Sequence, residues 1–298
     1  MLNDENNIKL HIDITIPFFL NNCIHRTNLT ELVFKHYTNI KNKLSNKANI
    51  TFTLVGSEEE ISKNLALKYI DETDYHEFDQ KLYNIFDNET FKTNIHTNNM
   101  WLLLTDKFRY CFKKSFEKNP DISLLFGSND IVSCDYFNQI IDFYNPDENQ
   151  LYGISAFNRG NNAVLFLYYN GLTNKFNENN DCFWWNGVSP DQRSVYNYCG
   201  ATIGFNKHLY TQYYDELLNS IICHDEGIIE ELTLKLPDVK EFISREVFYL
   251  NTKTLSNNDI NNFVDLHSYF NSNIITYNIF NNKFIQKFQE EYNEIINL

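Results

Sequence analysis

The chain has 298 residues, 43% of them hydrophobic and 16% aromatic, which is enough for a sizeable buried core in one large domain or two small ones. Its formal net charge is −14, from 25 Lys and Arg against 39 Asp and Glu, and it contains no Lys/Arg-rich block. This charge disfavours nucleic acid as a partner, because nucleic-acid binding normally needs a basic face that displaces counterions.

The chain has neither the cysteine pattern nor the start of a typical secreted protein. Its six cysteines are scattered, without a Cys-x-x-Cys pair, and several lie in apolar runs where a reduced cysteine acts as a small hydrophobic residue. The segment Met1–Glu5 is polar and acidic, unlike a signal peptide, and no apolar run approaches the ~20 residues of a membrane span. We therefore expect a soluble, cytoplasmic protein.

The first part of the chain predicts a strand–helix–strand unit. Apolar and polar residues alternate over Leu10–Ile16, as in a half-buried strand, and Pro17 ends the pattern. Asn28 and Glu31 can form a capping box at the start of a helix, and Ile50–Val55 predicts a second strand. Such a unit favours a parallel sheet with right-handed crossovers.

The middle of the chain repeats this order. A helix is predicted from about Thr105 to Phe116, and the nearly continuous apolar run Ile122–Phe126 is typical of a central strand covered on both faces. Further on, Leu151–Phe157 and Ala163–Tyr169 predict the two strands of a hairpin.

The last part of the chain predicts an extension of the same structure. Apolar residues in Phe280–Leu298 are spaced as in an amphipathic helix, and no linker rich in Pro, Gly or Ser precedes it. We therefore predict an α/β domain over residues 1–240, with a mixed central sheet flanked by helices. A helical C-terminal extension over residues 241–298 is expected to pack on that domain.

The segment Gly127–Asp130, directly after the central strand, is the strongest candidate for a functional site. Ligands of open α/β sheets collect beyond the carboxyl ends of the strands. Gly127 permits a close turn, and Asp130 supplies a hard oxygen ligand that can hold Mg²⁺ or Mn²⁺ against a diphosphate. Asp130 can equally cap the next helix, or the segment can be a simple turn, and the residues alone leave these alternatives open.

The order of the segments from about Leu10 to Leu236 resembles the GT-A glycosyltransferases, in particular their family 2-like members. Each motif is short, and the specificity of the resemblance lies in their order and spacing. The matching features are the strand end Pro17-Phe18 with Arg26 in the next loop, the pair Lys107-Phe108, the acidic motif Gly127-Ser128-Asn129-Asp130, the aromatic Trp184-Trp185 before Gly200-Ala201, and the cluster His224-Asp225-Glu226-Gly227.

This resemblance implies a GT-A-like (Rossmann-like) fold that transfers a sugar from a nucleoside-diphosphate sugar, with UDP as the expected nucleotide, to a hydroxyl of a glycan or other acceptor. It places Asp130 where the family binds a divalent cation, Mn²⁺ or Mg²⁺, and the phosphates. The family commonly has Gly-Ser-Asp-Asp here, so Asn129 replaces a charged ligand by a neutral one and weakens the expected metal affinity.

The resemblance also implies roles for the other donor-site residues. Pro17, Phe18 and Ser128 fall beside the donor, and Glu58 and Glu59 fall where these enzymes often hydrogen-bond the nucleotide base. Arg26 and Lys107 can contact phosphate, although Lys107 also fits the ordinary solvent face of a helix.

For catalysis the resemblance implies that Asp225 is the base that deprotonates the acceptor in an inverting displacement, with Glu226 as its rival. Both carboxylates also suit the first turn of a helix. His224 and His267 are candidate ligands of a metal or phosphate. Trp184 and Trp185, with Gly200 and Ala201 after them, can contact a sugar, although the two tryptophans can equally pack in the core.

Two other functions remain open. A sugar nucleotidyltransferase shares the sheet topology but usually carries a glycine-rich basic loop after the first strand, whereas Pro17–Thr27 contains no glycine. A degenerate protein of the same fold could bind a carbohydrate or a partner protein without turnover, and Asn129 favours that alternative.

Overall fold

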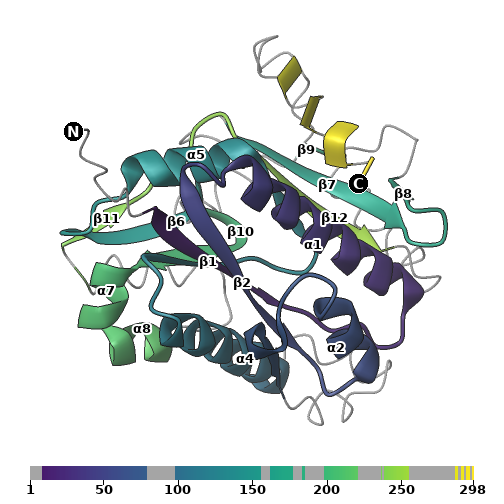
Figure 1. The fold of residues 1–298 in the computed structure, drawn as a ribbon, viewed down its shortest axis with the longest axis horizontal. Coiled ribbons are helices and arrows are strands. Elements are labelled where there is room, and N and C mark those ends of the chain that lie inside the picture. Colours follow the sequence, from purple (N-terminus) through teal and green to yellow (C-terminus); the bar gives the residue numbers. More distant parts are fainter. Residues whose placement is uncertain are drawn as a thin grey trace, which may run out of the picture.

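A computed structural model describes residues 9–78, 98–155, 162–176, 183–184, 198–220, 236 and 238–254, together with 286–287, 290–291, 293–295 and 297–298 of the C-terminal tail. In this part of the chain, α-helices lie on both faces of a central β-sheet, and a second sheet lies beside it (Figure 1). The predicted α/β class is therefore confirmed.

The elements alternate between strands and helices through the first half of the described chain. In chain order they are β1 (Leu10–Pro17), α1 (Ile24–Lys43), β2 (Ala48–Gly56), α2 (Glu60–Ala66), a short 3₁₀ helix (Glu72–Asp74), β3 (Tyr75–Glu77), α4 (Asn98–Glu117), β4 (Ile122–Leu125), β5 (Asp130–Val132), α5 (Cys134–Phe143), β6 (Asn149–Ser155), β7 (Ala163–Asn170), β8 (Lys175–Phe176), β9 (Phe183–Trp184), β10 (Tyr198–Asn206), α7 (Lys207–Gln212), α8 (Tyr214–Ser220), β11 (Val239–Glu241) and β12 (Phe248–Thr254).

The central sheet of the described residues has seven strands in the order β11-β6-β10-β4-β1-β2-β3. The strands β3, β2, β1 and β4 are parallel to one another, whereas β10 runs antiparallel to both of its neighbours. The second sheet has the order β5-β12-β7-β8, with β9 also paired to β7. The prediction of a mixed central sheet flanked by helices is thus confirmed.

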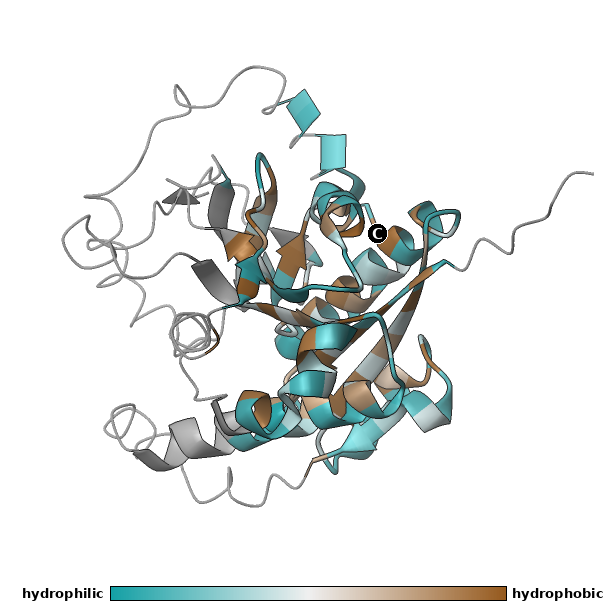
Figure 2. Ribbon diagram, turned by 90° about the vertical axis from the view of Figure 1, so that its left-hand side faces the viewer, coloured by the Kyte–Doolittle hydropathy of each residue, from teal (hydrophilic) through white to brown (hydrophobic). Residues whose placement is uncertain are grey.

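Strand β1 divides the core into two layers. Its side chains alternate across the sheet, so Ile12, Ile14 and Ile16 pack in one hydrophobic cluster with α1 and α5. Asp13 and Thr15 lie on the other face, which α4, α7 and α8 cover (Figure 1). Figure 2 shows the result, with hydrophobic residues concentrated on the strands and hydrophilic residues on the outward sides of the helices.

The carboxylate of Asp13 is fully buried under the end of α4 and is held by several partners. It accepts hydrogen bonds of 2.7 Å from the hydroxyls of Thr51 and Thr53 on β2. The Nζ atom of Lys118 lies 3.2 Å from the Asp13 carboxylate and 2.7 Å from that of Asp74. Because a buried charge is costly unless it is paired, this network stabilises the packing of α4 on β1 and β2.

Two local predictions are wrong. The strands β6 and β7 do not form a hairpin, because β6 pairs with β10 and β11 in the central sheet while β7 pairs with β12 in the second sheet. The helix α1 begins at Ile24, so Asn28 lies inside it and caps nothing. The Asn28 amide instead donates a hydrogen bond of 2.6 Å to the carbonyl of Gly171.

The described residues after 240 pair or pack with elements of the first 240 residues. The predicted boundary falls inside β11, and β12 lies between β5 and β7 in the second sheet. Residues of the tail return to α1 and α5: Ile295 joins the core, Glu294 pairs with Lys43, and the Glu291 carboxylate accepts a hydrogen bond from the Cys134 N–H. No helix in the described part of the chain is long and apolar enough to cross a membrane.

Replacement of Asp13 tests the buried network. We expect Asp13→Ala to lower the free energy of unfolding by about 3–5 kcal/mol, because it removes the buried carboxylate that accepts from the Thr51 and Thr53 hydroxyls and shares Lys118 with Asp74. The measurement is urea unfolding followed by circular dichroism. The control is Glu117→Ala, which removes an exposed partner of Lys114 and should change the free energy by less than about 0.5 kcal/mol. A loss below about 1 kcal/mol for Asp13→Ala would contradict the role of this network.

Candidate functional site

The parallel strands β1, β2 and β4 end side by side, at Pro17, Gly56 and Leu125. The backbone pairing continues one residue past the strand ends. The Phe18 N–H donates to the carbonyl of Val55 at 2.9 Å, and the Phe126 N–H donates to that of Thr15 at 3.1 Å. The loops that follow the three strands therefore start together at the carboxyl edge of the sheet, where ligands of open α/β sheets bind.

At this edge the Asp130 carboxylate closes the turn that begins at Gly127. Asp130 is 2% exposed, and its Oδ2 atom accepts a hydrogen bond of 3.0 Å from the Gly127 N–H. Its Oδ1 atom accepts one of 2.7 Å from the Tyr249 hydroxyl, and its backbone carbonyl accepts one of 2.9 Å from the Tyr37 hydroxyl. Asp130 does not cap the next helix, because α5 begins at Cys134.

The turn requires glycine at its first position. A Cβ atom at Gly127 would lie 2.2 Å from the Oδ2 atom of Asp130, far inside van der Waals contact. The other end of the turn is fastened to β12, since the Asn129 amide donates to the Thr252 carbonyl at 3.0 Å and the Asn129 carbonyl accepts from the Thr252 N–H at 2.8 Å. Ser128, between them, is half-buried.

Lys107 on α4 is buried at the same edge and does not lie on the solvent face of its helix. Its side chain is 2% exposed, and its Nζ atom donates a hydrogen bond of 2.8 Å to the carbonyl of Phe18, the first residue after β1. Burial lowers the pKa of Lys107 to about 8, against smaller opposite effects of Cys111 and Glu59.

The carboxylate of Glu59, in the loop after β2, is held in one orientation. Its Oε2 atom accepts hydrogen bonds from the hydroxyls of Ser57 (2.9 Å) and Ser62 (3.2 Å) and from the Asn21 N–H (3.3 Å). Among the described residues, no donor contacts Oε1. The neighbouring Glu58 is exposed. The geometry therefore favours Glu59 over Glu58 as the ordered carboxylate of this edge.

The remaining predicted residues are not all brought to this edge. Arg26 is exposed on the first turn of α1. The pairing of β10 with β6 is irregular between Cys199 and Ile203, so Gly200 and Ala201 lie in a bulge of the kind often found beside binding sites. Trp184 forms part of β9. The residues Trp185, His224, Asp225, Glu226 and His267 lie outside the described residues.

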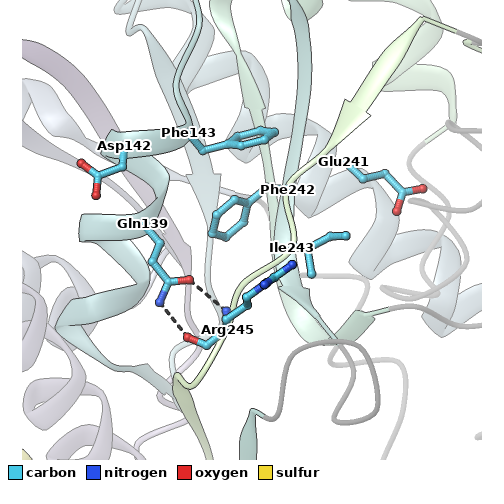
Figure 3. Close-up of a pocket in the computed structure, with 7 residues that line it drawn as sticks. All are labelled: Gln139, Asp142, Phe143, Glu241, Phe242, Ile243 and Arg245. Carbon is cyan, nitrogen blue, oxygen red and sulfur yellow. Dashed lines mark hydrogen bonds between the residues drawn. The ribbon is translucent and has the colours of Figure 1, made fainter.

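A shallow pocket lies at the opposite edge of the sheet (Figure 3). It is lined by the end of α5, by Glu241 at the end of β11, and by Phe242, Ile243 and Arg245 after it. Gln139 and Arg245 close one side through two hydrogen bonds, and Asp142 and Glu241 point away from each other. Because β6 runs parallel to β4, this pocket is at the amino edge, away from the loops described above.

The described residues contain no metal site built from three protein ligands. In this part of the chain, no three His, Cys, Asp or Glu side chains are grouped to hold a metal ion. Both carboxylate oxygens of Asp130, the predicted ligand, already accept hydrogen bonds from protein groups. Asn129 brings no charge to the turn.

No family model matches the chain, and no curated protein matches it. This chain shows a distant structural likeness to solved structures of three kinds of nucleotide-sugar enzyme. The galactosyltransferase LgtC, in complex with donor and acceptor sugar analogues, is 12% identical, with 77% of this chain and 72% of that chain covered and a TM-score of 0.36. Mouse xyloside xylosyltransferase 1 is 8% identical, with 78% and 85% covered and a TM-score of 0.40.

A synthetase of CMP-2-keto-3-deoxy-manno-octonic acid, in complex with CTP, is 8% identical, with 87% of this chain and 99% of that chain covered and a TM-score of 0.37. At these identities and TM-scores the likeness establishes no function for this chain. A functional assignment therefore has to rest on the residues at the carboxyl edge of the sheet.

Replacement of Gly127 tests the geometry of the turn. We expect Gly127→Ala to lower the free energy of unfolding by about 1–3 kcal/mol, because the added methyl group meets the Asp130 carboxylate and forces the buried turn to shift. Thermal and urea unfolding measure the change. Ser128→Ala, at the next position, should stay within about 0.5 kcal/mol of the wild type. Equal stability of the two variants would show that the turn is not closed by Asp130.

Proposed function

We propose that the protein transfers a sugar from a nucleoside-diphosphate sugar to a hydroxyl of a glycan or other acceptor. The donor binds at the carboxyl edge of β1, β2 and β4. The observation that carries this proposal is the presence, at that edge, of an oriented carboxylate (Glu59) and a buried ammonium (Lys107). A nucleoside diphosphate needs both kinds of group, an acceptor for its base and a positive charge for its phosphates.

The bonding of Glu59 favours a uracil base. Oxygen Oε2 is occupied by three protein donors, and Oε1 is directed by them but has no partner among the described residues. Uracil presents a single ring N–H between two carbonyls, so one carboxylate oxygen satisfies it. Cytosine presents an unprotonated ring nitrogen at that position, which a carboxylate repels. We therefore propose a UDP-sugar as the donor.

The chemical step that we propose is a single inverting displacement. The acceptor oxygen attacks the anomeric carbon and forms the new C–O bond, while the bond from that carbon to the phosphate oxygen breaks. The nucleoside diphosphate leaves with the electron pair, and positive charge at the edge stabilises it. The acceptor proton passes to Asp225, or to its neighbour Glu226, as the general base.

The donor and acceptor contacts follow the sequence resemblance. Pro17, Phe18, Ser128 and Asn129 line the donor, and Arg26 is proposed to reach its phosphates from α1. Trp184 and Trp185 are proposed to stack on a sugar ring, and the bulge that contains Gly200 and Ala201 to face the acceptor.

A second candidate function is binding of a nucleotide or glycan without turnover. It is favoured by the motif itself, since Asn129 is neutral and the Asp130 carboxylate is bonded internally. The two functions differ in a direct assay, because a binding protein retains affinity for UDP but hydrolyses no UDP-sugar. A sugar nucleotidyltransferase would instead release pyrophosphate from UTP and a sugar 1-phosphate.

Substitution of the loop carboxylates tests the base contact. We expect Glu59→Gln to weaken UDP binding about tenfold, because it replaces a charge-assisted acceptor by a neutral amide of the same shape. Isothermal titration of UDP measures the affinity. Glu60→Gln, in the first turn of α2, is the matched control and should bind as the wild type does. If Glu58→Gln weakens binding more than Glu59→Gln, the proposed contact is wrong.

Substitution of the proposed base tests the chemical step. A screen of UDP-sugars for slow hydrolysis identifies the donor without its acceptor. We expect Asp225→Asn to lower kcat by about 10²–10⁴ with little change in the donor KM, because the general base acts only in the transition state. Glu226→Gln is the paired variant, and a larger loss there would exchange the two roles. NMR of the anomeric proton of the product should show inversion, and retention would remove Asp225 from this role.

A further inference from the structure

The Asp130 carboxylate is an internal hydrogen-bond acceptor in this fold. It is nearly inaccessible to solvent, and its two oxygens accept hydrogen bonds from Gly127 and Tyr249, which approach from the turn and from β12. The strands β5 and β12 pair at this position, with Asp130 opposite Asn251. A carboxylate placed in this way fixes the shape of the Gly127–Asn129 turn, and a metal ion would have to reach buried oxygens that each already accept a hydrogen bond.

Lys107 differs from Asp130, because its buried ammonium has fewer hydrogen-bond acceptors around it than it has N–H donors. An ammonium group has three N–H donors, and among the described residues only the Phe18 carbonyl accepts from it. No carboxylate of the described residues forms a salt bridge with Lys107, although the charge of Glu59 partly opposes the effect of burial on its pKa. A buried charge with N–H donors that lack acceptors is unfavourable, so its presence at the carboxyl edge points to a ligand that completes its bonding.

We propose that the donor diphosphate is bound without a divalent cation. Lys107 supplies the positive charge, and Asp130 acts as a latch that shapes the Gly127–Asn129 turn through Tyr249. This inference rests on the proposed function, because it assigns the charge partner of the same donor. A charge surrounded by protein acts over several ångströms, since the low dielectric of the interior screens it weakly. The ammonium can therefore stabilise the leaving diphosphate from beneath the Phe18 loop.

The first test measures metal dependence on the full-length wild-type chain. UDP is titrated calorimetrically in EDTA and then in excess Mn²⁺ or Mg²⁺. We expect the dissociation constants to agree within about twofold. An increase in affinity of more than about tenfold with either metal overturns the inference but leaves the proposed function standing. Absence of UDP binding under every condition contradicts the proposed function itself.

The second test removes the charge of Lys107. We expect Lys107→Met to weaken UDP binding at least about tenfold. Its unfolding midpoint should be equal to or above that of the wild type, because a buried ammonium with too few acceptors is replaced by an apolar chain of similar length. Lys113→Met, at an exposed position of the same helix, should change neither quantity. Wild-type affinity of Lys107→Met, or a loss of affinity that follows only from a lowered unfolding midpoint, overturns the role of Lys107.

The third test separates a latch from a metal ligand at Asp130. Asp130→Asn and Tyr249→Phe each remove one side of the same hydrogen bond. If Asp130 is a latch, the two variants weaken UDP binding to a similar extent in EDTA and in Mn²⁺, and the double variant is no weaker than the worse single one. If Asp130 binds a metal, only Asp130→Asn loses an Mn²⁺-dependent gain that Tyr249→Phe retains. The second result overturns the inference even when both variants fold less stably.

Discussion

The parallel hydrogen bonding of β1 to β2 and β4 is the constraint on which the rest of the structure depends. It aligns Pro17, Gly56 and Leu125 at one edge, so the loops that follow these strands are brought together. It also fixes which side chains of β1 face each helical layer, because successive residues point to opposite faces. Both the hydrophobic core under α1 and the polar groups under α4 follow from this one register.

The polar groups under α4 show how the same sheet face serves two purposes. Toward the amino edge, Asp13 is surrounded by donors, and its charge is matched by Lys118. Toward the carboxyl edge, the buried Lys107 has a single carbonyl acceptor among the described residues. The first arrangement is complete without any ligand and stabilises the fold. The second is incomplete, which is typical of groups whose partner arrives with the substrate.

The sequence was sufficient to predict the strands β1, β2 and β4, because β1 alternates between apolar and polar residues and β4 is a nearly continuous apolar run. It predicted neither α2 nor β3. It was not sufficient to predict the partners of β6 and β7, since these depend on β10 and β12 much later in the chain. The residues of the candidate site also fall into those that the sequence could predict and those that it could not. Gly127 and Asp130 could be found from their place after a buried strand, whereas the bond of Asp130 to Tyr249 is a contact between distant segments. For Lys107 a local signal existed: its neighbours at one and two helical turns, Cys111 and Ser115, are small residues that are fully buried.

The attachment of the turn to β12 has a consequence for the order in which the molecule is assembled. The groups that hold the turn, Tyr249 and Thr252, are synthesised well over a hundred residues after Gly127, because they belong to β12. Before β12 has been made, the parallel half of the sheet can pair, but the turn lacks its bonds to Tyr249 and Thr252. A product cut short before Phe248 would lack the pairing of β12 with β5 and the bonds that give the turn its shape. The proposed donor site is therefore complete only after β12 has been made, because the bonds from Tyr249 and Thr252 give the turn its shape.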